Sequence, residues 1–92
     1  MATLDDYRKE IDEIDKQLTK LFEKRMDIVL NVAKYKKENK LDVFQKGREE
    51  EVIKKAIDSL ENKDYSDELV SFMNATMEIS RGLQKRKIKD EE

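Results

Sequence analysis

The sequence predicts an all-α fold with one very long N-terminal helix, two shorter helices and a second copy of the chain as partner. Between Leu4 and about Asn39 there is neither proline nor glycine, and apolar residues recur in steps of three and four, as on one face of a helix. A helix of about 36 residues is roughly 54 Å long, whereas a compact 92-residue chain is only about 30 Å across. A partner must therefore cover the apolar stripe, and the simplest partner is a second copy.

Three helices account for nearly the whole chain and are predicted over residues 4–39, 46–61 and 66–86. Thr3 is expected to be the N-cap of the first helix and Ser66 that of the third, because a hydroxyl can accept a hydrogen bond from the free amides of a first helical turn. The apolar positions that define the three helix faces are Leu4, Tyr7, Ile11, Ile14, Leu18, Leu21, Ile28, Val32 and Tyr35 in the first, Val52, Ile53, Ala56, Ile57 and Leu60 in the second, and Leu69, Phe72, Met73, Thr76, Ile79, Ser80 and Leu83 in the third.

Length and composition limit the classes of function that fit. The chain is expected to be one domain over residues 1–92 that ends in a charged tail over residues 87–92, with Lys85 to Glu92 frayed or disordered. A net charge of −2 argues against a nucleic-acid partner, and the absence of Cys and His removes disulfides, thiolate chemistry and the commonest zinc ligand, so no metal is expected. No apolar run is long enough for a membrane span and the charged start does not resemble a signal peptide, so a cytoplasmic protein is expected.

Two cations interrupt the apolar stripe of the first helix. Arg25 occupies the position where the stripe requires an apolar residue between Leu21 and Ile28, and Lys36 lies 11 residues further along. At roughly 100° per residue their side chains point within about 20° of each other, about 16 Å apart along the axis. No acidic residue lies one turn away on the stripe. Because unpaired cations facing a core are costly, the pattern predicts an anionic ligand.

The other two helices repeat this pattern. Arg48 and Glu49 lie one turn before the apolar face of the second helix, and Ser80 and Gln84 share the core-facing side of the third. With Arg25 and Lys36, they predict an anion site that contains neutral hydrogen-bonding groups and one carboxylate.

Each of these residues also has a structural alternative. Arg25 could fix the register of a helical dimer, and Lys36 could extend its ammonium to water along Val32. Arg48 and Glu49 could form a solvated first turn, and Gln84 could be exposed near the chain end. The site interpretation rests on the fact that the polar interruptions fall on the core-facing sides of all three helices.

These residues resemble the all-helical chorismate mutases over about residues 4–86. The resemblance covers three separate helices, and it indicates a single-domain, monofunctional member. One position departs from the pattern, because the residue three before Arg48 is often Asp in the family and is Gln45 here. The matching residues are Arg8, Ile11-Asp12-Glu13-Ile14-Asp15, Leu18-Thr19-Lys20-Leu21, Arg25, Val32-Ala33-Lys34-Tyr35-Lys36, Arg48-Glu49, Ser80 and Gln84.

The resemblance implies an isomerase that converts chorismate to prephenate by a [3,3] rearrangement, on the route to phenylalanine and tyrosine, without a cofactor. It implies interlocked homodimers that share two sites. Arg8 is 17 residues, or about 25 Å, from Arg25 along one helix, so it would enter a site from the partner chain.

The resemblance also implies a role for each site residue. Lys36, Gln84 and Arg25 would be catalytic. Arg8 and Arg25 would each bind a carboxylate, and Lys36 and Gln84 would donate to the ether oxygen. The implied substrate-binding set is Arg8, Arg25, Lys36, Gln45, Arg48, Glu49, Ser80 and Gln84, in which Glu49 accepts from the ring hydroxyl, Arg48 supports the charge of the site and Ser80 contacts a carboxylate.

Two alternatives stay open on the sequence alone. One is an isochorismate pyruvate lyase, which uses the same fold and a similar cationic site for elimination. The other is a non-catalytic helical dimer that binds an anionic metabolite or a partner enzyme.

Overall fold

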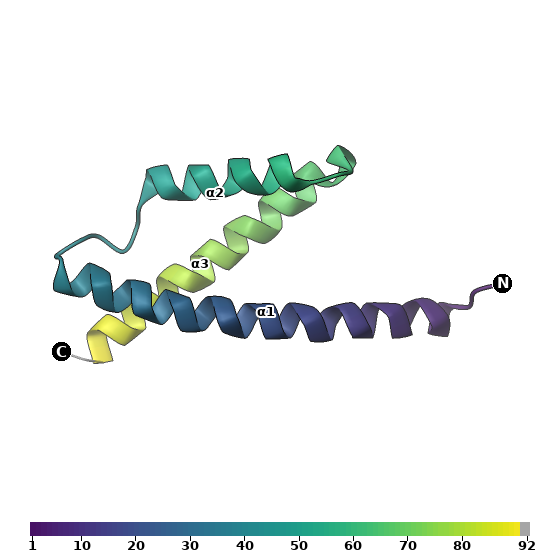
Figure 1. Cartoon of the computed structure of the whole chain (residues 1–92), viewed down its shortest axis with the longest axis horizontal. Helices are drawn as coiled ribbons and strands as arrows, with labels where there is room; N and C mark the ends of the chain where they lie inside the picture. The colour runs from purple at the N-terminus through teal and green to yellow at the C-terminus, as the bar shows by residue number, and fades with distance from the viewer. Residues whose placement is uncertain (91–92) are drawn as a thin grey trace.

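The computed structural model describes residues 1–90, and within them it contains helices and connecting turns but no β-strand. The elements in chain order are α1 (Leu4–Glu38), α2 (Lys46–Ser59), a short 3₁₀ turn (Lys63–Tyr65) and α3 (Ser66–Asp90). Helix α1 lies along the long axis of the molecule, and α3 runs diagonally from the end of α2 back across α1 (Figure 1). The predicted all-α class with one long and two shorter helices is confirmed for this part of the chain.

The start of α1 is the predicted capping site. The hydroxyl of Thr3 accepts from the amide of Asp6 at 3.2 Å, and the carboxylate of Asp6 accepts from the amide of Thr3 at 2.9 Å. These reciprocal bonds satisfy two amides that have no partner within the helix. At the other end α1 stops at Glu38, one residue before the predicted end, and Lys40 then adopts a positive φ of 55° as the chain turns.

The predicted N-cap of α3 is wrong. Ser66 has helical dihedral angles, and its hydroxyl donates to the carbonyl of Lys63 at 2.7 Å instead of accepting from a helix amide. The reason is the 3₁₀ turn, which leads directly into α3 so that the amide of Ser66 already has the carbonyl of Lys63 as partner. The capping side chain is that of Asn62, which accepts from the amide of Asp64 at 3.0 Å and begins the 3₁₀ turn.

Two further boundaries differ from the prediction. Helix α2 ends at Ser59, two residues early, because Leu60 is extended. Helix α3 continues to Asp90, four residues beyond its predicted end, so the expected disorder is wrong for residues 85–90. Lys87 and Lys89 lie in this last turn, where positive charge complements the helix dipole. Residues 91–92 lie outside the described part.

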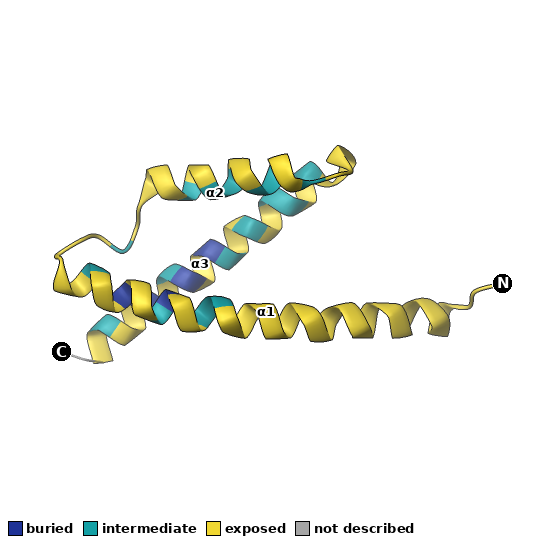
Figure 2. Cartoon of the chain, in the orientation of Figure 1, coloured by how far each residue is buried: buried dark blue, intermediate teal, exposed yellow. Residues whose placement is uncertain are grey.

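The core of the single chain is small and lies where α3 meets α1. The apolar stripe that begins at Leu4 is exposed along its length, and residues 4–24 contain no buried position (Figure 2). The described residues extend over 57 × 26 × 14 Å, so the chain is a long rod with a short cross-packed end. None of the helices in residues 1–90 has the length and apolarity needed to cross a membrane. The buried residues in this range are Val29, Ala33, Met77, Ser80 and Gln84.

A larger side chain at position 33 is expected to weaken this packing. Ala33 is 1% exposed, so the extra atoms of Ala33→Leu must displace their neighbours, and the free energy of unfolding should fall by about 1–3 kcal/mol. Urea unfolding at a fixed protein concentration measures this change. Lys34→Leu, at the next and exposed position, is the control. Equal stability of the two variants would show that α1 and α3 do not pack closely at Ala33.

Candidate active site

Helices α1, α2 and α3 and the loop between α1 and α2 surround a cleft of about 420 Å³. This volume lies in the range of about 300–1,000 Å³ that is usual for small-molecule sites. Five cations and one carboxylate line the cleft, so it attracts anions. The structure brings seven of the eight predicted site residues to its walls: Arg25, Lys36, Gln45, Arg48, Glu49, Ser80 and Gln84.

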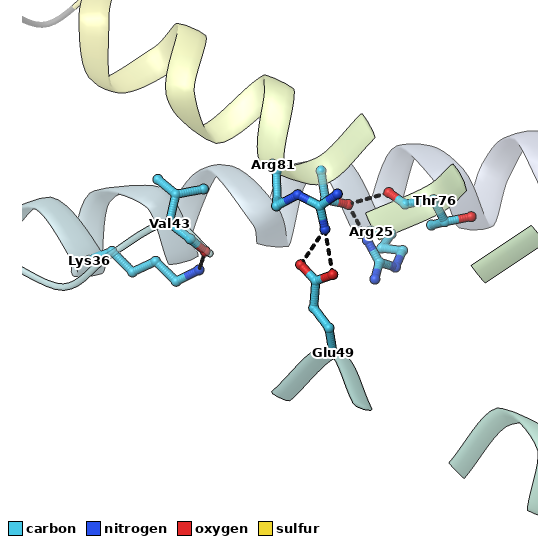
Figure 3. A network of polar contacts seen from close by, with 7 residues as sticks. Arg25, Lys36, Val43, Glu49, Thr76 and Arg81 are labelled. Carbon is cyan, nitrogen blue, oxygen red and sulfur yellow. Dashed lines mark hydrogen bonds and ion pairs between the residues drawn. The ribbon is translucent and has the colours of Figure 1, made fainter. Parts of the chain in front are cut away.

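Arg25 is held by the buried hydroxyl of Ser80. Nη1 of Arg25 donates to Oγ of Ser80 at 2.5 Å, and Oγ in turn donates to the backbone carbonyl of Thr76 at 2.8 Å (Figure 3). The single hydroxyl hydrogen is thus used within α3, and the oxygen lone pairs remain to accept from the guanidinium. Ser80 therefore orients Arg25 without neutralising it, and the positive charge stays available to a ligand.

Lys36 is held in the same way by neutral oxygens. Its Nζ donates to the carbonyl of Val43 at 2.6 Å and to Oε1 of Gln84 at 3.0 Å. Because an ammonium can only donate, the oxygen of the Gln84 amide must face it, which leaves the NH₂ group of Gln84 to donate elsewhere. Burial lowers the pKa of Lys36, and the negative charge of Glu49 opposes that shift. An anion in the cleft would act in the same direction as Glu49 and stabilise the charged lysine.

Glu49 is joined to a residue that the sequence interpretation missed. Nη1 of Arg81 on α3 donates to both carboxylate oxygens of Glu49 on α2 (Figure 3). The guanidinium carbon of Arg81 lies 5.4 Å from the centre of the Phe44 ring. A signal for Arg81 was present, since it is four residues after the apolar Met77 and three before Gln84, and these spacings place all three on one helix face.

Gln45 and Arg48 lie at the edge of the cleft. Gln45 is the N-cap residue of α2, but its side chain makes no capping bond, and Nε2 donates to the carbonyl of Asp42 at 2.7 Å. Arg48 donates to Glu51 at 3.2 Å on its own helix, and both side chains are half exposed or more. Both residues line the cleft, but their hydrogen bonds stabilise the loop and the first turn of α2 rather than the centre of the cleft.

Arg8 is the predicted site residue that one chain does not bring to the cleft. It lies near the start of α1, exposed, with its guanidinium 3.9 Å from the carboxylate of Asp5 one turn away. At 1.5 Å per residue it is about 25 Å along the helix from Arg25. The chain alone therefore forms a cleft without Arg8.

The described part of the chain is all-helical with a cationic cleft, and comparison with known proteins gives its family. The family described as chorismate mutase type II matches residues 7–85, so this chain belongs to that family, whose enzymes are isomerases. A relative named T-protein, from Haemophilus influenzae (strain ATCC 51907 / DSM 11121 / KW20 / Rd), is 41% identical over 49 residues. That match covers 53% of this chain and 13% of the relative. No solved structure matches the chain significantly.

Removal of the Lys36 charge is expected to change how stability depends on pH. The pKa of Lys36 is lower in the folded protein than in the unfolded chain, so between these two values the unfolded state binds more protons and wild-type stability rises with pH. Lys36→Met removes this titration. The free energy of unfolding of wild type minus that of the variant should therefore increase as pH rises toward the ordinary lysine pKa.

Urea unfolding at a series of alkaline pH values measures this difference. Lys34→Met, exposed on the same helix, is the control for other groups that titrate in this range. A difference between wild type and Lys36→Met that stays constant or falls with pH would contradict the burial of the Lys36 charge.

Proposed function

We propose that this protein is a chorismate mutase that converts chorismate to prephenate in the cytoplasm, on the route to phenylalanine and tyrosine. Family membership supports this function, and so does one observation on the site. Arg25 and Lys36, two cations of α1 that line the cleft, are each oriented by a neutral side chain of α3 rather than neutralised by a carboxylate. Such a cleft binds anions while it keeps hydrogen-bond donors in fixed positions.

The rearrangement needs orientation and charge stabilisation and no covalent help. Within one molecule of chorismate a C–O bond breaks while a C–C bond forms, so the protein supplies neither a nucleophile nor an electron acceptor. The substrate is a dianion that must adopt a compact, pseudo-diaxial conformation. Negative charge develops on the ether oxygen as the C–O bond lengthens, and donors already fixed at that position lower the barrier.

In our proposal Lys36 and Gln84 supply these donors. The two side chains are hydrogen-bonded to each other, so they can reach one small ligand together. An ammonium has three hydrogens, of which two are used by Val43 and Gln84, and the third is available to the ether oxygen. The NH₂ group of Gln84 is the second donor.

The remaining groups would bind and orient the dianion. Arg25 holds one carboxylate, since a guanidinium suits bidentate carboxylate recognition, and Ser80 supports the same carboxylate. Glu49 accepts from the ring hydroxyl. Arg48 and Gln45 contribute charge and hydrogen bonds at the edge of the cleft.

We further propose that the protein is an intertwined homodimer in which Arg8 of the partner chain binds the second carboxylate. Three features support this. The apolar stripe of α1 is exposed in the single chain. An apolar groove of about 510 Å³ runs between α1 and α3, with Leu18, Phe22 and Phe72 among its walls. The exposed Arg8 is too far along α1 to reach its own cleft.

Incubation of the purified protein with chorismate, followed by the loss of its ultraviolet absorbance, tests the activity. We expect turnover by wild type, and loss of about two to three orders of magnitude in kcat/KM for Arg25→Ala with the helical fold retained. Lys34→Ala, exposed on the same helix, is the control. Turnover of isochorismate instead would identify a pyruvate lyase, and turnover of neither compound would favour a non-catalytic binding protein.

A mixing experiment tests the shared site. Arg8→Ala and Arg25→Ala homodimers should each be nearly inactive. When equal amounts are unfolded together and refolded, about half of the dimers are mixed if association is random. In each mixed dimer one site carries both substitutions and the other carries neither, so roughly a quarter of all sites should regain wild-type activity. Folded mixed dimers without recovered activity would exclude an Arg8 contribution across the interface.

A further inference from the structure

We propose that Arg81 is a positioning residue of this site, which fixes the Glu49 carboxylate and screens its charge so that a dianion with a hydroxyl group can bind beside it. This inference rests on the proposed function and adds a residue to it. The family resemblance assigns no role to position 81.

The ion pair joins two elements of the cleft. Arg81 on α3 donates through Nη1 to both oxygens of Glu49 on α2, and the two side chains are 27% and 22% exposed. The other ion pairs given for residues 1–90 lie within single helices and are at least half exposed on both sides. Solvent and salt screen this partly buried pair less than they screen the surface pairs.

The ring of Phe44 completes this arrangement. Phe44 lies in the loop just before α2, and the guanidinium carbon of Arg81 stands 5.4 Å from its ring centre. A guanidinium over an aromatic face is attracted to it and loses rotational freedom. Arg81 is therefore held by Phe44 of the loop as well as by Glu49 of α2, and it restricts the orientation of the Glu49 carboxylate.

The charges around Glu49 explain why this cation is needed. Lys36 on α1 lines the same cleft and is close enough to feel the charge of Glu49, and Lys46, Arg48 and Glu50 are neighbours of Glu49 on α2. The three cations bond to other groups: Lys36 to Val43 and Gln84, Lys46 to Glu50, and Arg48 to Glu51. Arg81 is thus the cation that bonds Glu49 in the described structure. An uncompensated Glu49 would repel a dianion and would attract the ammonium of Lys36 away from Gln84.

The ion pair still leaves Glu49 able to bind a ligand. A carboxylate has about four lone-pair positions, and Arg81 occupies two of them. The remaining positions can accept from a hydroxyl group. Arg81 thereby turns a repulsive charge into a neutral, oriented acceptor, which favours ligands that carry a hydroxyl over analogues that lack it.

A double-mutant cycle tests this inference, with kcat and KM for chorismate measured for wild type, Arg81→Met, Glu49→Gln and the double variant. Arg81→Met should lower kcat/KM about tenfold, with the larger part in KM, because the bare carboxylate repels the dianion. In the Glu49→Gln background the same substitution should change kcat/KM less than about twofold, since no charge remains to be screened. Equal effects in both backgrounds, or no effect of Arg81→Met in the wild type, would overturn the proposal.

Two further variants separate positioning from support of the fold. Arg81→Lys keeps the charge and should recover part of the lost kcat/KM. If Arg81 only supported the fold, Arg81→Met would lower the melting temperature, and its effect on kcat/KM would be the same in the wild-type and Glu49→Gln backgrounds. Arg86→Met removes another arginine of α3, exposed and outside the cleft, and should leave kcat/KM unchanged. If Arg81→Met does not fold, Arg81→Lys takes its place in the cycle, with the same expectation of a smaller effect in the Glu49→Gln background.

The same cycle with calorimetric binding of chorismate distinguishes this proposal from the proposed function. A wild type that binds chorismate without turnover would contradict the mutase activity, and the dissociation constants would still decide the role of Arg81. A wild type that neither binds nor converts chorismate would overturn both.

Discussion

The structure depends on how two cations of α1 are accommodated where α3 packs against that helix. Arg25 and Lys36 stand on the side of α1 that α3 crosses, and a cation in such a position must find hydrogen-bond acceptors. Helix α3 supplies them as Ser80 and Gln84, which are two of the buried residues in the described chain. The crossing of α1 and α3 therefore depends on polar contacts as much as on the apolar Val29, Ala33 and Met77.

The choice of neutral acceptors has a functional consequence. A carboxylate opposite Arg25 or Lys36 would pair with the cation and neutralise the charge that an anionic ligand would require. A hydroxyl and an amide orient the cations and leave their charge intact. Burial lowers the pKa of Lys36, so its charged form costs free energy that an anion in the cleft would offset.

The single carboxylate of the cleft has a charged partner instead of a neutral one. Glu49 is the one acidic residue among its lining groups, and Arg81 bonds both of its oxygens. Arg25 and Lys36 are thus held by neutral partners and Glu49 by a charged one, so the cleft keeps a net positive charge. Glu49 was predicted from the sequence and Arg81 was not, although its spacing to Met77 and Gln84 places it on their helix face. An arginine in a chain with 46% charged residues is ordinarily a surface residue, and its contacts with Phe44 and Glu49 appear only in the fold.

The sequence by itself determined the helices and the side of each that faces inward, because apolar periodicity and capping depend on neighbours in the chain. It placed the Thr3 cap correctly, and it named seven residues that line one cleft. The tertiary structure decided what those residues contact. The bonds of Arg25 to Ser80 and of Lys36 to Gln84, and the pairing of Arg81 with Glu49, depend on how segments 55, 48 and 32 residues apart meet. Helical periodicity predicts the face on which a side chain lies, but it does not predict which residue of another helix that side chain contacts.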